Sequence, residues 1–263
     1  MNYSSRLGQI RIYFGKCLRG FKNEQGWKSL IGAIIIPILL VTVMGEDVFA
    51  EYTDTSQGSF AIICACLWIG LFNSLTSVCK ERNIIKHEYR AGLYLSSYIT
   101  AHMIFELIIS LIETAFVAVI ILIRYWDNLG ELGDDASVKK AMIVLTFFLS
   151  IYAADALGIL ISSIVKNTVA AMYLMPFILI FQLVFAGCIF PLENISEVIG
   201  NLTLSKWGYK ALLDISEVEQ NSIMGSSEEG ISYIICWTCI IAFTIIYALV
   251  SCKVLKNVEK DHR

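Results

Sequence analysis

Long apolar runs separated by short polar segments dominate the sequence. The runs lie at about 27–44, 59–78, 94–123, 141–165, 169–186 and 231–252. A helix of about 20 apolar residues is long enough to cross the hydrocarbon core of a bilayer, and it satisfies its backbone hydrogen bonds internally. The pattern predicts an all-α membrane protein with six transmembrane helices in one membrane domain, residues 27–255. The third run is long for one crossing, so it must tilt or project beyond the hydrocarbon.

Residues 1–26 precede the first run, and residues 5–22 have the pattern of an amphipathic helix. Lys16 and Arg19 lie opposite an apolar stripe at helical spacing. The stripe consists of Leu7, Ile10, Phe14, Cys17, Leu18 and Phe21. A basic amphipathic helix of this kind lies at the inner membrane face and is attracted to anionic lipid.

Composition and charge distribution agree with membrane insertion. Hydrophobic residues make up 57% of the 263 residues and charged residues 16%, whereas soluble domains carry about a quarter charged residues. Fifteen of the twenty Lys and Arg residues lie at 1–28, at 79–92, at the turn 166–168 or at 253–263. Because short basic loops stay in the cytoplasm, we expect a cell-membrane protein with both termini inside, a cytoplasmic tail at 256–263, and no nucleic-acid partner.

The eight cysteines do not predict a metal site. Cys236 and Cys239 have the spacing of a zinc pair, but no second Cys or His pair lies near them in the sequence. Structural zinc sites need four such ligands. We therefore interpret both as small packing residues within the last apolar run.

The charged segment 79–92, between the second and third runs, carries the most specific motif. Glu81-Arg82, His87-Glu88-Tyr89, Gly92 and Ser96-Ser97-Tyr98 resemble the first intracellular loop of the G subfamily of ABC transporters and of related bacterial ABC-2-type permeases. Similar motifs occur at 158–163, 185–192 and 204–213. The resemblance implies an N-terminal connecting helix, a cytoplasmic coupling helix between spans two and three, and a re-entrant outer segment within 195–220, between spans five and six.

In that family the coupling helix contacts the ATPase. The resemblance assigns this role to Glu81, Arg82, His87, Glu88, Tyr89 and Arg90. Asn83 departs from the basic residue that some members carry. The alternative is that these charges only solvate a loop and set the topology. The sequence has no P-loop, because Ile10 stands where the first glycine of a motif ending at Gly15-Lys16 would be. We therefore expect this chain to bind no cofactor, and two copies of a separate ATPase subunit to bind ATP and Mg.

The resemblance also implies a second permease subunit, either another copy or a homologous chain, and a substrate path between the two. Its lining residues would be Ile69, Phe72, Ile180 and Leu183, and its outer gate Gly187, Cys188 and Ile189. The alternative for each apolar residue is ordinary helix packing.

Glu106, Glu113 and Asp155 lie within predicted spans. Acids within a membrane are costly and are candidates for functional sites. Glu106 and Glu113 are seven residues apart, which places them on one helix face. Three interpretations are open: protonated acids, hydrogen-bonded links between helices, or groups that face a wet path.

The sequence therefore favours the permease subunit of a bacterial ABC exporter for an amphipathic, lipid-like, peptide or drug-like substrate. Two other classes remain open. One is a membrane immunity or sensor protein of similar fold. The other is an intramembrane enzyme, which the three scattered histidines (His87, His102 and His262) do not favour.

Overall fold

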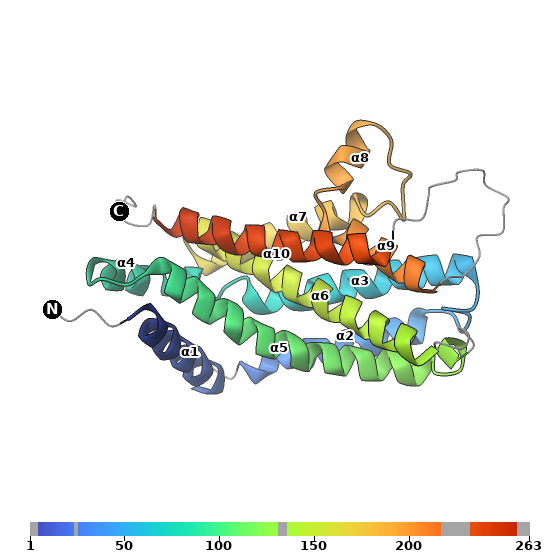
Figure 1. The fold of residues 1–263 in the computed structure, drawn as a ribbon, viewed down its shortest axis with the longest axis horizontal. Coiled ribbons are helices and arrows are strands. Elements are labelled where there is room, and N and C mark those ends of the chain that lie inside the picture. Colours follow the sequence, from blue (N-terminus) through green and yellow to red (C-terminus); the bar gives the residue numbers. More distant parts are fainter. Residues whose placement is uncertain (1–4, 24–25, 131–135, 217–231, 257–263) are drawn as a thin grey trace.

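The computed structural model describes residues 5–23, 26–130, 136–216 and 232–256, which form a helical bundle (Figure 1). These residues contain no β-strand, so the prediction of an all-α protein is confirmed. The α-helices are α1 (Arg6–Asn23), α2 (Trp27–Val43), α3 (Tyr52–Ser74), α4 (Arg82–Arg90), α5 (Leu95–Arg124), α6 (Ala136–Ile164), α7 (Thr168–Val184), α8 (Ile195–Gly200), α9 (Leu204–Ser216) and α10 (Tyr233–Leu255). Short 3₁₀ turns lie at η1 (Cys79–Glu81) and η2 (Asn128–Gly130).

Four helical segments of the described residues are long and apolar enough to cross a membrane. They are Tyr52–Arg90, which contains α3, and the helices Leu95–Arg124, Ala136–Ile164 and Tyr233–Leu255. Helices α2 and α7 are also apolar, but each has only 17 residues. The six-span arrangement therefore stays a prediction.

Helix α3 begins at Tyr52, earlier than the predicted apolar run that starts at residue 59. Its first turns are polar, but their side chains have partners inside the protein. Thr55 Oγ1 accepts a hydrogen bond from Phe49 N at 2.8 Å, and the hydroxyls of Ser56 and Tyr209 lie 2.6 Å apart. Because these polar groups are satisfied by tertiary contacts, the helix extends into a stretch that apolar periodicity does not mark.

Small residues bring α3 and α6 into close contact at the centre of the bundle. A Cβ atom added to Gly70 would meet the backbone O of Ile151, and would lie 2.9 Å from the Ala154 Cβ. A Cβ atom added to Gly158 would collide with Ser74 Oγ. Each helix therefore contributes two small residues spaced by four. Membrane helices associate through such contacts because lipid provides no hydrophobic force between them.

The inner ends of α3 and α6 are joined by a side-chain cap. Ser162 Oγ accepts hydrogen bonds from Val78 N at 3.0 Å and Cys79 N at 2.9 Å. These two amides lie where the chain leaves α3 and turns toward α4. The cap therefore fixes the start of the α4 segment to the α6 helix.

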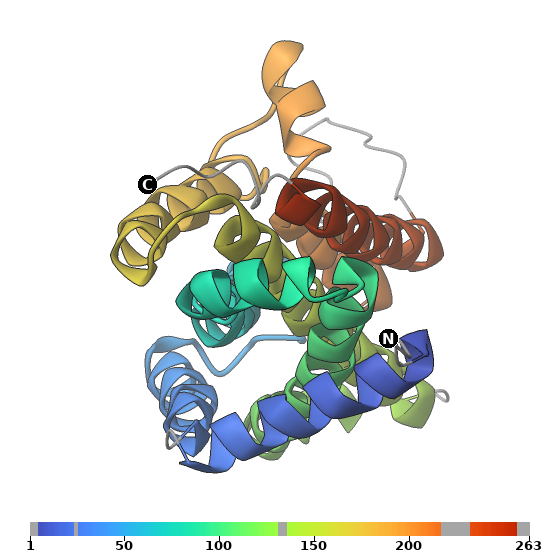
Figure 2. The same ribbon diagram turned by 90° about the vertical axis from the view of Figure 1, so that its left-hand side faces the viewer.

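Three distant parts of the chain meet at one end of the bundle. Helix α1, helix α4 and the C-terminal end of α10 lie there (Figure 1). Viewed from this end, α4 lies over the middle of the bundle and α1 crosses one side, with α7 and α10 on opposite sides (Figure 2). Helix α1 packs against α5.

The segment that the sequence predicted as re-entrant contains α8 and α9, and its residues 217–220 lie outside the described part. Helix α8 stands off the bundle (Figure 2), whereas α9 packs against α3, α6, α7 and α10. Gln182 of α7 holds the start of α9, because its Oε1 accepts hydrogen bonds from Leu204 N at 2.9 Å and Ser205 N at 3.2 Å.

We expect Gly158→Leu to destabilise the protein by about 1–3 kcal/mol, the usual cost of overpacking a core. Its side chain would meet Ser74 of α3, and the Leu75 N lies 3.2 Å from the added Cβ. Thermal unfolding of the purified protein in detergent measures the loss. The control is Gly20→Ala, where no atom lies within 4 Å and the helix gains up to about 1 kcal/mol. An unchanged melting temperature in Gly158→Leu would contradict this account of the crossing.

Candidate functional site

Helix α4 is a short polar helix with defined ends. Ile85 is its buried residue and points into an apolar cluster with Val78, Leu93 and Tyr98. The helix ends at a turn in which Gly92 has a φ of +102°, a conformation that suits glycine. Leu93 N donates to Glu88 O at 3.0 Å, as in a helix C-terminal motif with an apolar contact beyond the glycine. The sequence therefore builds a helix with one buried anchor and an exposed outer face.

Arg82 ties the first turn of α4 to the end of α6. Its Nη1 donates to the backbone O of Ser163 and to that of Val165, each at 3.0 Å. Those carbonyls belong to the C-terminal end of a helix, where a positive charge is favourable. Arg82, predicted as a contact to the ATPase, thus has partners within its own chain.

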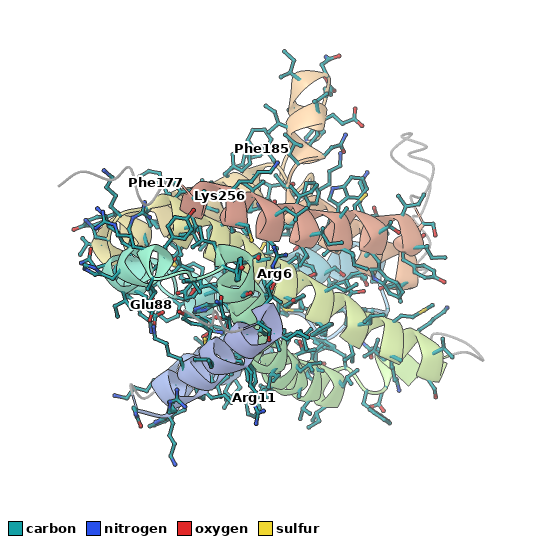
Figure 3. The ribbon with its side chains drawn as sticks, turned by 60° about the vertical axis from the view of Figure 1, so that its left-hand side comes forward. Arg6, Arg11, Glu88, Phe177, Phe185 and Lys256 are labelled. Atoms are coloured by element: carbon teal, nitrogen blue, oxygen red, sulfur yellow. The ribbon has the colours of Figure 1, made fainter. Side chains whose placement is uncertain are left out.

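Glu81 and Glu88 are bound by α1. Glu81 Oε2 accepts from Lys16 Nζ at 3.1 Å and from the Tyr98 hydroxyl at 3.0 Å. Glu88 Oε2 accepts from the Tyr13 hydroxyl at 2.8 Å. Figure 3 shows Glu88 on the side of α4 that faces α1, with Arg11 on the opposite side of α1. Both acids of the predicted coupling set therefore hold the connecting helix in place.

Gln9 clamps α1 onto the turn that follows α4. Its side-chain Nε2 donates to Gly92 O at 3.2 Å, and its Oε1 accepts from Tyr94 N at 2.9 Å. The guanidinium of Arg6 lies 5.0 Å from the centre of the Tyr94 ring, a cation–π contact. Together with the contacts of Tyr13 and Lys16, the clamp makes α1 and α4 one connected unit.

The environment keeps Tyr13 and Cys17 of α1 protonated. Burial raises the pKa of the Tyr13 phenol, and the hydrogen bond to Glu88 and the charges of Glu88 and Glu81 raise it further. Burial is also the main cause that raises the pKa of Cys17 to about 12, so its thiol stays protonated at neutral pH. Tyr13 therefore acts as a hydrogen-bond donor throughout the physiological range.

The outer face of α4 is what remains open to a partner. Asn83, Ile84, His87 and Arg90 are exposed, and Tyr89 is half-buried against the apolar cluster. The predicted coupling set therefore divides into Glu81, Arg82 and Glu88, which bind their own chain, the half-buried Tyr89, and the exposed pair His87 and Arg90. The sequence motif did not reveal Gln9, Tyr13 and Lys16 as partners, because they lie outside the apolar stripe of α1 and have no motif of their own.

The predicted path residues differ in burial, because three reach the surface of the chain and one lies in its core. Phe72 of α3 and Ile180 of α7 are 56% and 55% exposed, and Leu183 is half-buried. Ile69 is only 4% exposed and lies in the hydrophobic core of this chain, while its neighbour Trp68 is 50% exposed. Figure 3 shows Phe177 on α7 and Phe185 just beyond its C-terminal end. The exposed large apolar residues of α3 and α7 are Trp68, Phe72, Val169, Met172, Tyr173, Leu174, Phe177, Ile180, Phe181 and Val184.

The predicted gate residues lie in the turn after α7. Gly187 has a φ of +86°, and a Cβ atom added there would lie 3.4 Å from Leu192. Cys188 is half-buried with its Sγ 4.0 Å from Ser56 O, whereas Ile189 is 53% exposed. The glycine thus allows a turn that no other residue type adopts readily.

The three predicted acids come together in the protein interior, on α5 and α6. All are buried, and Asn73 Nδ2 of α3 donates to Glu106 Oε2 at 3.0 Å. Asp155 lies beside the small-residue crossing, because its backbone N is 3.2 Å from a Cβ atom added to Gly70.

These features define a multi-pass helical membrane protein with a clamped polar helix at one end. A family model described as "ABC-2 type transporter" matches residues 9–215. The chain belongs to this family, and it is a transmembrane permease component of an ABC transporter. The family is one of transport permeases that normally work with an ABC ATPase partner. Among curated proteins, none matches the chain by sequence.

We expect Tyr13→Phe to weaken the attachment of α1 by about 0.5–1.5 kcal/mol, the net value of one hydrogen bond. The lost bond is the one to Glu88 Oε2. Hydrogen exchange of the α1 amides in detergent should become faster. The matched control is Tyr173→Phe on α7, where the side chain is 73% exposed. Equal exchange in the two variants would contradict the clamp.

Proposed function

We propose that this chain is the membrane subunit of an ATP-driven exporter whose ATP is hydrolysed by a separate ATPase. Two permease chains, identical or homologous, would assemble with two ATPase subunits, which hold the ATP and Mg. All six apolar helices would cross the cell membrane, with both termini in the cytoplasm. The substrate would be amphipathic, lipid-like, or peptide- or drug-like, because the candidate path surface is apolar.

The observation that carries this proposal is the fixing of α4 from three sides. Ser162 and Arg82 bind the beginning of α4 to the end of α6. Gln9 binds the turn after α4 to α1, and Ile85 anchors the middle of α4 in the apolar cluster. A force applied to such a helix reaches α3, α5 and α6 together instead of being lost in a mobile loop. A loop that only solvated charge and set topology would not require these contacts.

The chemistry of the exposed face indicates what the ATPase should present. His87 and Arg90 offer positive charge or hydrogen-bond donors, and Ile84 offers an exposed apolar side chain, 47% exposed, one turn before. Electrostatic complementarity guides association and suppresses wrong partners. We infer an acidic contact surface with an apolar pocket on the ATPase.

The second permease chain would contact the exposed apolar surface of α3 and α7. Trp68, Phe72, Phe177 and Ile180 are aromatic or large aliphatic residues on that surface. Lipid solvates such residues as well as protein does, and the family resemblance is what assigns this exposed surface to the contact between permease chains. Ile69 is left out of the proposed path, since it lies in the core of one chain.

We expect Arg90→Glu to lower the amount of ATPase that copurifies with the chain by about tenfold, which corresponds to about 1.4 kcal/mol. Transport should fall with it, while the melting temperature of the permease stays unchanged, because Arg90 is exposed. Lys253→Glu is the matched control, since it reverses an exposed cation on α10 near the same end of the bundle.

Equal ATPase recovery in both variants would remove the proposed contact. Copurification also separates the exporter from its rivals. A membrane immunity or sensor protein, or an intramembrane enzyme, needs no bound ATPase. If no ATPase copurified with the wild-type chain, the exporter proposal would be contradicted.

A further inference from the structure

Two carboxyl groups in the membrane core have no partner. Glu113 of α5 and Asp155 of α6 are both 0% exposed. In the described residues, none of their four side-chain oxygens has a hydrogen bond of normal geometry, although the side chains of Ser74 and Asn73 lie near the Asp155 carboxyl group. Glu106 differs, because Asn73 donates to it. Burial without a partner is exceptional for a polar group, and each such group in a native structure calls for an explanation.

In the part of the chain that the structure describes, no Lys, Arg or His side chain acts directly on Glu113 or Asp155. Asp155 interacts electrostatically with Glu106 and Glu113, both of which are also acidic. Among the described residues, the cation that acts on this cluster is Lys80 in η1, and it acts on Glu106. The polar and titratable groups that face the cluster are Asn73, Ser74 and Cys66 from α3, Cys17 from α1, Lys80 from η1, Tyr152 from α6 and Glu106 from α5.

A metal ion does not fit this place. The described residues contain no group of three or more His, Cys, Asp or Glu side chains arranged to hold one. An ionised carboxylate that is buried without a counter-charge takes up a proton instead of staying charged. Neighbouring carboxylates reinforce this, because like charges at short range disfavour ionisation. The ligand whose chemistry fits two unpaired carboxylates in an apolar interior is the proton.

We propose that Glu113 and Asp155 form a proton-binding site in the membrane core, in which each carboxyl group is held as the neutral acid. The site lies where α3, α5 and α6 meet. Asn73 of α3 contacts Glu106, and Gly70 of α3 packs against the Asp155 backbone. The close α3–α6 contact thereby helps to keep water from the two acids, which are both 0% exposed, so proton binding depends on this packing of the helices.

Infrared spectroscopy of the full chain in lipid nanodiscs tests the site directly. At neutral pH, where exposed Asp and Glu side chains are ionised, we expect a carbonyl stretching band of un-ionised carboxylic acid. Glu113→Gln and Asp155→Asn should each remove part of this band. Glu46→Gln is the control, since its carboxylate is exposed and paired with Arg124, and it should leave the band unchanged. A wild-type protein without the band at neutral pH would overturn the proposal.

The pH dependence of stability provides a second measurement. It compares the slope of stability against pH, so a variant that is less stable at one pH can still be interpreted. The folded state holds two protons. The unfolded chain releases these protons once the pH is above the ordinary pKa range of Asp and Glu side chains. Wild-type stability should therefore fall as the pH rises through neutrality, by the linkage between proton binding and folding. The double variant Glu113→Gln/Asp155→Asn should lose this slope and melt at a higher temperature at alkaline pH.

Thermal unfolding at varied Na⁺ or K⁺ concentration distinguishes the proton site from a bound alkali cation. If the two carboxylates were ionised around Na⁺ or K⁺, wild-type stability would rise with the concentration of that ion, and the double variant would be less stable than the wild type at neutral pH. Either result would refute the proton site. Neither measurement involves an ATPase, so the outcome is independent of the exporter proposal.

Discussion

The close crossing of α3 and α6 is the contact on which the other features depend. Gly70 and Ser74 on one helix meet Ala154 and Gly158 on the other. Beyond the crossing, Ser162 receives the chain as it leaves α3, and Arg82 returns to the end of α6. Because helices in lipid associate through tight packing and hydrogen bonds, the small residues of this pair determine both the position of α4 and the environment of Asp155.

Helix α1 completes the inner end of the molecule. It runs beside the first turns of α5, where Gln9, Tyr13 and Lys16 contact Gly92, Glu88 and Glu81 in turn. The long α5 helix, with 30 residues, exceeds the roughly 20 residues that span the hydrocarbon. Its first turns therefore have room to extend past the membrane and to carry α1. Glu81 and Glu88, which the family resemblance assigns to contact with the ATPase, instead bind α1.

The order and type of the long helices followed from apolar run length, a property local to each segment. Sequence reasoning placed α5 and α7 within a few residues of their bounds, since charged or glycine-containing stretches flank them. It missed the first turns of α3, because Thr55 and Ser56 are polar and find partners only in the folded protein. It also placed Ile69 and Phe72 on one path surface, whereas the fold buries Ile69 and leaves Phe72 exposed.

The sequence by itself determined that the chain is helical and apolar, that it carries a basic segment between its second and third apolar runs, and that three acids lie within apolar stretches. Run length, charge and spacing are sufficient for these statements. Only the tertiary structure decided which side chains meet. Glu81 and Glu88 turned toward α1, His87 and Arg90 stayed exposed, and Glu113 and Asp155 came together without a partner. The physical reason is that hydrogen bonding and burial depend on the neighbours that helix packing supplies, and those neighbours are distant in sequence.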